Sequence, residues 1–143
     1  MDDLQAPSAA PPTRVLVIDD SNTIRRSAEI FLRQGGHEVL LAEDGFDALA
    51  KVNDHAPQLI FCDILMPRLD GYQTCAIIKR NPRFAHVPVI MLSSKDGLFD
   101  KARGRMVGSE DYLTKPFTKD QLLRAVQQFV GAASAAGDTV PGA

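Results

Sequence analysis

The sequence predicts an α/β protein whose single domain is a doubly wound sheet of five parallel strands. Between residues 13 and 131, five short apolar runs alternate with five segments of helical spacing. Such units in series are typical of a parallel sheet with helices on both faces, because parallel strands need a crossover between them. Four of the runs also carry polar residues at their ends, where α/β sheets bind ligands.

The first two units show the clearest helix boundaries. Residues 14–19 form a continuous apolar strand, and we expect Ser21 to cap the following helix. The glycines at 35–36 are expected to end that helix, because glycine accepts the left-handed backbone of a helix end. Residues 37–42 are predicted to form the second strand, and Asp44 to open the second helix.

The third and fourth units follow the same pattern. Residues 58–62 are predicted to form a strand, since Pro57 before them excludes a continuing helix. Asp70 is expected to start the next helix. Residues 87–92 are predicted to form the fourth strand, and residues 95–106 a helix with poor apolar patterning.

The fifth unit ends the ordered part of the chain. Residues 110–113 are predicted to form a short strand, and Thr118 to cap the final helix. Apolar side chains at helical spacing give this helix one buried face. They are Leu122, Leu123, Val126, Phe129 and Val130.

Composition limits the classes of function. A chain of 143 residues fits one domain, and 45% hydrophobic with 24% charged residues is ordinary for a soluble protein. The net charge of −2 favours neither nucleic acid nor an anionic membrane as partner. The basic residues at 25–26 and within 101–105 are interpreted as solvated faces. Residues 1–12 and 132–143 lack periodicity and bulk, which predicts disordered tails around a domain at 13–131.

The cysteines and the N-terminus indicate a cytoplasmic protein. Cys62 lies within an apolar run and Cys75 within a predicted helix, so we expect two buried thiols and no disulfide. The N-terminus begins with two acids and lacks the apolar core of a secretory signal. No stretch reaches the length of a transmembrane helix, which predicts no membrane insertion.

The polar residues at the strand ends are the candidate site. Asp19 and Asp20 follow the first strand, Asp63 the third, Ser93 the fourth, and Lys115 lies just beyond the fifth. If these strands are neighbours, acids, a hydroxyl and an ammonium gather at one edge. Paired carboxylates repel each other unless a cation solvates them, and Mg²⁺ prefers oxygen ligands. The pattern therefore predicts a site for Mg²⁺ and a phosphoryl group.

Each residue also has an ordinary structural interpretation. The Asp19–Asp20 pair is favourable at a helix N-terminus, and Asp63 can be a loop cap. Ser93 is unremarkable as a turn residue, and Lys115 as a surface lysine. The four groups of polar residues, in this order and each at a strand end, are together much less ambiguous than any one of them alone.

Taken together, these motifs resemble the receiver domain of two-component response regulators over residues 13–131. The matching segments are VLVIDDS at 15–21, DILMPRLDG at 63–71, SS at 93–94 and KPF at 115–117. The resemblance implies the flavodoxin-like, CheY-like fold with strand order 2-1-3-4-5. It also implies a phosphoacceptor signalling protein rather than an enzyme, one that assists its own phosphorylation and dephosphorylation.

The resemblance assigns a role to each candidate residue. It implies that a histidine kinase phosphorylates Asp63, that Asp20 binds Mg²⁺ directly, and that Asp19 contributes through water. The backbone carbonyl of Leu65 would be a further ligand, with Asp63 itself. Ser93 and Lys115 would contact the phosphoryl group.

A conformational switch is also implied, at Tyr112, three residues before Lys115. Phosphorylation would draw the Ser93 hydroxyl inward, and the Tyr112 ring would follow into the space vacated. The changed surface would cover about residues 95–130 and bind the output partner. The alternative for Tyr112 is an ordinary aromatic on an edge strand.

Three segments, 44–51, 66–75 and 91–102, look particularly like the PilG-type regulators of twitching motility. This resemblance implies a stand-alone monomer with a chemotaxis-type kinase as donor and a pilus-control protein as partner. One alternative is a flagellar chemotaxis regulator of the CheY type. A remote one is an Mg²⁺-dependent phosphohydrolase, for which Ile64 and Leu65 provide no general acid. Direct DNA binding is disfavoured, because no helix-turn-helix follows residue 131.

Overall fold

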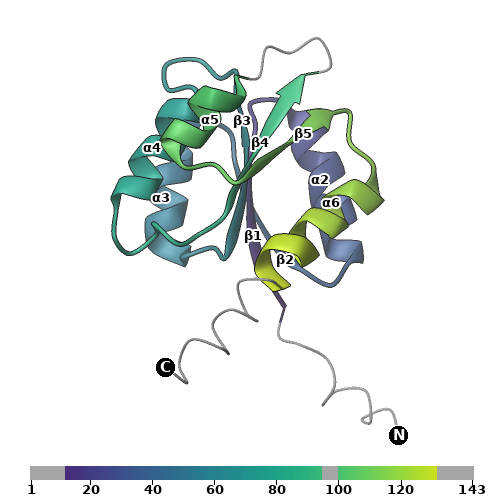
Figure 1. Ribbon diagram of the computed structural model, residues 1–143. Coiled ribbons are helices and arrows are strands. Elements are labelled where there is room, and N and C mark those ends of the chain that lie inside the picture. The colour runs from purple at the N-terminus through teal and green to yellow at the C-terminus, as the bar shows by residue number, and fades with distance from the viewer. Residues whose placement is uncertain (1–11, 95–99, 132–143) are drawn as a thin grey trace, which may run out of the picture.

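The computed structural model describes residues 12–94 and 100–131, and these form a five-stranded parallel sheet between two helical layers (Figure 1). The strand order is β2-β1-β3-β4-β5, which confirms the predicted order and fold class. The strands are β1 (Arg14–Ile18), β2 (Glu38–Ala42), β3 (Leu59–Asp63), β4 (Val89–Ser94) and β5 (Asp111–Lys115). The helices are α2 (Asn22–Gln34), α3 (Gly45–His55), α4 (Gly71–Arg80), α5 (Lys101–Val107) and α6 (Lys119–Val126), which continues as a π-helical turn, Gln127–Gly131.

Both faces of the sheet are covered, which explains why its strands are continuous apolar runs. Successive residues of a strand point to opposite faces. In β1, Leu16 and Ile18 join the cluster beneath α3, α4 and α5, whereas Val15 and Val17 join the cluster beneath α2 and α6 (Figure 1). All four side chains are fully buried. The two cores hold the sheet rigidly from either side.

The predicted helix caps are confirmed. The side chains of Ser21, Asp44, Asp70 and Thr118 each accept a hydrogen bond from the backbone of the helix they precede. These bonds satisfy amides that the helix itself leaves without a partner. The first helix ends at the predicted glycine pair, where Gly36 has a φ of +86°.

Several predicted boundaries are wrong at the strand ends. β3, β4 and β5 were predicted to end at residues 62, 92 and 113, but they extend to Asp63, Ser94 and Lys115. The additional residues pair across strands, for example Asp63 with Leu92 and Ser94 with Lys115. Asp63 and Lys115 are therefore the last residues of their strands, and Ser93 lies within β4.

The predicted helix at 95–106 is only partly tested. The described helix, α5, begins at Lys101 with Asp100 as its N-cap, and residues 95–99 lie outside the described residues. The predicted tails, 1–12 and 132–143, lie outside them as well, apart from Pro12. Cys62 and Cys75 are buried free thiols, as predicted. Among the described residues, no helix has the length and apolar character needed to cross a membrane.

Candidate functional site

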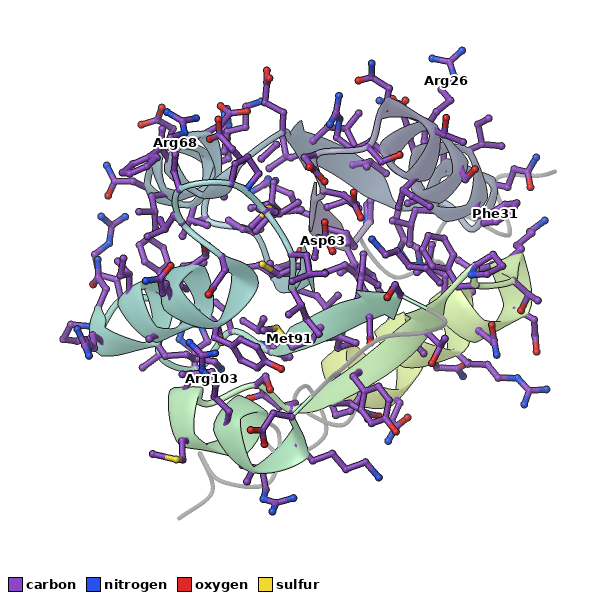
Figure 2. All side chains as sticks on the ribbon, turned by 90° about the horizontal axis from the view of Figure 1, so that it is seen from above. Arg26, Phe31, Asp63, Arg68, Met91 and Arg103 are labelled. Atoms are coloured by element: carbon purple, nitrogen blue, oxygen red, sulfur yellow. The ribbon has the colours of Figure 1, made fainter. Side chains whose placement is uncertain are left out.

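The sheet brings the predicted site residues to one edge. β1 and β3 are paired so that Ile18 lies opposite Cys62, which puts Asp19 beside Asp63. β4 and β5 continue the row, with Ser94 opposite Lys115. Asp63 consequently lies near the middle of the molecule when this edge is seen from above (Figure 2). Parallel topology thus assembles residues that are far apart in sequence.

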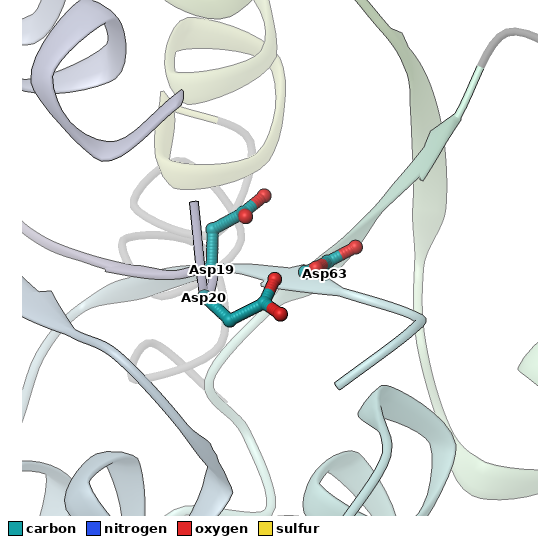
Figure 3. Close-up of side chains that lie close together, drawn as sticks. All are labelled: Asp19, Asp20 and Asp63. Atoms are coloured by element: carbon teal, nitrogen blue, oxygen red, sulfur yellow. The ribbon is translucent and has the colours of Figure 1, made fainter. Parts of the chain in front are cut away.

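Three carboxylates form the centre of this edge. One oxygen from each of Asp19, Asp20 and Asp63 lies within 4.8 Å of the others (Figure 3). The side chains differ in exposure: Asp19 is fully buried, Asp63 is 3% exposed, and Asp20 is exposed to solvent. A solvent-accessible acid beside two buried ones gives an ion a route into the cluster.

Both carboxylate oxygens and the carbonyl oxygen of Asp19 accept hydrogen bonds. Its Oδ1 accepts from the backbone N–H of Ser21 at 2.9 Å, and its Oδ2 from the Lys115 ammonium at 3.0 Å. Its carbonyl oxygen accepts from the Arg25 guanidinium at 2.5 Å. A buried carboxylate needs such partners, because burial without them is costly.

Lys115 is the ammonium that the cluster requires. Its Nζ lies 3.0 Å from Asp19 Oδ2 and 3.0 Å from Asp63 Oδ1, although Asp19 follows β1 and Asp63 ends β3. Burial lowers the pKa of Lys115, but the hydrogen bond to Asp63 and the charge of Asp19 outweigh burial and raise that pKa above its ordinary value. Lys115 is therefore a permanent cation at this edge.

Asp63 is an unusual carboxyl group. Burial, followed by the negative charge of Asp19, raises its pKa from 3.8 to about 6, although the hydrogen bond from Lys115 opposes the shift. The backbone N–H of Leu65 also lies 3.4 Å from its Oδ1. A carboxylate that is costly to ionise gains most from a further cation.

The donor set fits a magnesium ion. Oxygens around Mg²⁺ at about 2.1 Å lie no more than about 4.2 Å apart, close to the span of the three carboxylates. One ammonium opposes three carboxylates, and the negative charge of Asp19 adds to burial in raising the pKa of Asp63. Asp19, Asp20 and Asp63 can therefore hold a hard divalent cation that keeps part of its water shell.

Ser93 and Tyr112 lie on the two strands beside this cluster. Ser93 is 4% exposed, and its hydroxyl donates to the carbonyl of Ser94 at 3.3 Å. Tyr112 is half-buried on β5 opposite Met91, and the Lys101 ammonium lies 5.5 Å from its ring centroid. Tyr112 is thus displaced along β5 from the carboxylates.

Two residues at this edge were missed from the sequence. Arg25 was interpreted as part of a solvated face, but it is half-buried and contacts Asp19. A Cβ added to Gly71 would lie 2.2 Å from the backbone oxygen of Asp63, so only glycine fits beside the end of β3. The Asp70–Gly71 pair indicates the start of a helix. No local sequence pattern, however, indicates the contact of Arg25 with Asp19 or the close approach of Gly71 to Asp63.

The family assignment follows from this geometry and from similarity to known proteins. Residues 15–127 match the model of the response regulator receiver domain, and the chain belongs to that family. It is 65% identical to protein PilG of Pseudomonas aeruginosa over 117 residues, which cover 82% of this chain and 87% of that protein. The chain is thus a response regulator receiver of the PilG type, which confirms the resemblance predicted from its sequence.

More distant relatives agree on the family and the fold. Protein PilH of Pseudomonas aeruginosa is 36% identical over 113 residues, which cover 79% of this chain and 93% of that protein. The crystal structure of the chemotaxis response regulator CheY4 of Vibrio cholerae superimposes with a TM-score of 0.78 at 31% identity, over 83% of this chain and 99% of that one. A putative response regulator from Chloroflexus aurantiacus gives a TM-score of 0.80 at 32% identity, over 85% and 99%.

Proposed function

We propose that a histidine kinase phosphorylates this protein on Asp63 in an Mg²⁺-dependent reaction, and that phosphorylation switches a protein-binding face. The observation that carries the proposal is the position of Asp63 at the end of β3, 3.0 Å from the Lys115 ammonium and beside Asp19 and Asp20. A carboxylate in this setting is a nucleophile with a cation ready for the incoming phosphoryl oxygens.

The proposed transfer uses Asp63 as acceptor. A bond forms between a carboxylate oxygen of Asp63 and phosphorus, and the phosphorus–nitrogen bond of the donor phosphohistidine breaks. The electron pair of that bond stays on the donor imidazole. Asp20, Asp63 and the Leu65 carbonyl would hold Mg²⁺, and Asp19 would act through water. The bound ion would supply charge neutralisation for the phosphoryl oxygens.

Lys115 and Ser93 complete the proposed phosphoryl site. Lys115 already bridges two carboxylates, so a phosphoryl oxygen on Asp63 would meet a fixed ammonium. Among the described residues, Ser93 donates to its own neighbour's carbonyl at 3.3 Å, a bond that a charged phosphoryl oxygen can replace with a stronger one. The protein would therefore act as a phosphoacceptor that assists its own modification, and not as an enzyme with a separate substrate.

The proposed output face comprises α5, β5 and α6, about residues 95–130, of which 95–99 lie outside the described residues. Movement of Ser93 toward a phosphoryl group would free space into which the Tyr112 ring can turn. The ring lies against Lys101 of α5, so its movement would alter that helix. Met106, on the same helix, is 85% exposed and available to a protein partner.

We assign the pathway by similarity to PilG, which favours a chemotaxis-type kinase as donor and control of type IV pili as output in the cytoplasm. The alternative is flagellar chemotaxis, for which the similarity to CheY4 is the supporting observation. Identity of 65% to PilG against 31% to CheY4 favours the pilus pathway. We expect the protein to act as a monomer.

The chemistry is tested by intact-protein mass spectrometry after incubation with acetyl phosphate and Mg²⁺. The wild-type protein should gain one phosphoryl group, and Asp63→Asn none. Asp120→Asn is the matched control, since Asp120 is an exposed acid on α6. Phosphorylation of Asp63→Asn at the wild-type rate would refute the assignment of the acceptor.

The pathway is tested in a Pseudomonas aeruginosa strain that lacks its own PilG. Expression of this protein should restore twitching motility, and expression of the Asp63→Asn variant should not. Restoration by both variants would show that phosphorylation of Asp63 is not the signal. Failure of both, with normal phosphorylation in vitro, would favour the flagellar alternative.

A further inference from the structure

Arg25 turns back from the first turn of α2 toward the cluster of carboxylates. Its Nη1 donates to the backbone oxygen of Asp19 at 2.5 Å, and its Nη2 donates to Oδ1 of Asn22. The Arg25 side chain is half-buried, whereas the side chain of the adjacent Arg26 is 76% exposed and lies 3.9 Å from Glu29. The two arginines therefore have different environments despite their adjacency.

The position of Arg25 opposes an ordinary rule of helix electrostatics. The N-terminus of a helix carries partial positive charge, which favours acids and disfavours cations in the first turn. The first turn of α2 has no acidic residue, and the guanidinium points back toward it. Residues that depart from such a local preference are typically found at functional sites. Here the neighbouring site is the three carboxylates.

The bond to the Asp19 carbonyl acts on Asp20. That carbonyl belongs to the peptide that joins the two acids, so fixing it fixes the direction in which the Asp20 Cα and side chain leave β1. The Asp19 side chain is already held by Ser21 and Lys115. Asp20 is exposed to solvent, and burial does not constrain its carboxylate. Besides its contact with Asp63, its direction therefore depends on the backbone before it.

We infer that Arg25 is a positioning residue for the cation site: it clamps the Asp19–Asp20 peptide so that the Asp20 carboxylate faces the bound ion. The inference rests on the metal site of the proposed function. The clamp and the charge of Arg25 act in opposite directions. The clamp strengthens Mg²⁺ binding, whereas a nearby positive charge weakens it.

Because the clamp and the charge act in opposite directions, the direction in which the Mg²⁺ affinity changes tells the two effects apart. Isothermal titration of Mg²⁺ into the full-length protein would compare the wild type with Arg25→Met and Arg26→Met. If Arg25 is a clamp, Arg25→Met should bind Mg²⁺ about 10-fold more weakly, as when other supports of metal ligands are removed. Arg26→Met loses the same charge one residue away and should bind as tightly as the wild type or slightly more tightly.

Arg25→Lys separates the clamp from the charge. Lysine keeps the positive charge but cannot bridge the Asp19 carbonyl and Asn22 with a planar fork. It should therefore also weaken Mg²⁺ binding, at least as much as methionine does, because the positive charge that opposes the ion remains. If Arg25 acted through charge alone, Arg25→Lys would bind like the wild type and Arg25→Met more tightly. Either result would overturn the inference.

A second readout needs no metal. In the protein with chelator, the amide resonances of Asp20 and Ser21 should shift and exchange faster in Arg25→Met than in Arg26→Met. Should Arg25→Met fail to unfold cooperatively, Arg25→Lys provides the test of affinity. Absence of saturable Mg²⁺ binding by the wild type would defeat the proposed function itself. Equal binding by the wild type and both Arg25 variants would defeat only this inference.

Discussion

The Lys115 ammonium lies 3.0 Å from Oδ1 of Asp63, across the two strands β3 and β5 that β4 separates. The same nitrogen lies 3.0 Å from Asp19. One cation is thus shared by two buried carboxylates, with the exposed Asp20 as a third acid nearby. The cluster has more negative than positive charge. A substitution that changes the charge of this cluster should therefore alter both the free energy of unfolding and the binding of Mg²⁺.

Removal of the shared ammonium should destabilise the protein in a pH-dependent way. Lys115→Met leaves Asp19 and Asp63 buried without their cation, which should cost about 3 kcal/mol of unfolding free energy at pH 8. The cost should shrink at pH 5, because the hydrogen bond from Lys115 lowers the pKa of Asp63 and its loss lets that carboxyl protonate more readily. Urea unfolding at both pH values, in chelator, measures the difference.

The control for this experiment is Lys119→Met, which removes an exposed lysine four residues away. Its effect should stay within about 0.5 kcal/mol at both pH values. A pH-independent loss of stability in Lys115→Met would mean that the lysine contributes packing rather than charge compensation.

Neutralisation of Asp63 should stabilise the metal-free protein. Its pKa is about 6 in the folded state and 3.8 ordinarily, so the folded state binds the proton more tightly. The stability contributed by this group is therefore full below pH 4 and declines as the pH rises through about 6. Above pH 7, Asp63→Asn should be more stable than the wild type by about 1 to 3 kcal/mol, and at pH 5 by roughly half of that.

Magnesium should reverse this order. An ion that binds only the folded state stabilises it in proportion to the logarithm of its concentration. At pH 7.5, millimolar Mg²⁺ should raise the melting temperature of the wild type and have little effect on Asp63→Asn. Because protons compete for the same carboxylate, Mg²⁺ binding by the wild type should weaken as the pH falls below about 6. Equal Mg²⁺ effects on the two proteins would remove Asp63 from the metal site.

A hydrogen bond links the start of α4 to the start of α5. The backbone N–H of Asp100 donates to the Tyr72 hydroxyl at 2.8 Å, and the Arg103 guanidinium lies 4.3 Å from the Tyr72 ring. Tyr72→Phe keeps the ring and removes the acceptor, which should cost about 1 kcal/mol. The Asp100 amide should exchange with solvent about 5-fold faster, measured by NMR.

The Arg103 amide is an internal control for that exchange experiment. It donates to the side chain of Asp100, the N-cap of α5, at 3.0 Å, and does not depend on Tyr72 directly. Its exchange should change less than that of Asp100. Equal acceleration of both amides would indicate that the variant unfolds α5 as a whole.

The features that sequence analysis predicted are those with a local cause. Ser21 and Asp44 each cap a helix by accepting from the backbone amide three residues further on, so their identity and spacing suffice. The grouping of Asp19, Asp63 and Lys115 also followed, because parallel strands align their carboxyl ends whatever their exact length. The site could therefore be outlined before any distance was known.

The features that sequence analysis missed have distant causes. β5 extends to Lys115 because it pairs with Ser94 of another strand, and α5 starts beside the hydroxyl of Tyr72. Arg25 and Arg26 look alike in sequence and differ only in what the folded chain places next to them. Hydrophobic patterns carry no signal for such contacts.

Gly71 provides the sharpest test of how the backbone supports the acceptor. Gly45 and Gly71 both start a helix directly after an aspartate cap. An added Cβ at Gly71 would lie 2.2 Å from the backbone oxygen of Asp63, which cannot move without displacing the end of β3. An added Cβ at Gly45 would instead meet side-chain atoms, Oγ1 of Thr74 at 2.5 Å and Cδ2 of Leu69 at 2.8 Å, and no backbone atom of the acceptor strand.

The matched substitutions should therefore differ both in stability and in chemistry. Gly71→Ala should destabilise the protein by about 2 to 4 kcal/mol and Gly45→Ala by about 1 kcal/mol, measured by urea unfolding. Because Gly71→Ala displaces the acceptor itself, phosphorylation by acetyl phosphate should slow at least 10-fold in the fraction that remains folded. Gly45→Ala should keep a rate close to wild type. If the two variants lose stability equally and retain the same rate, the close approach of α4 to Asp63 has no role in placing the carboxylate.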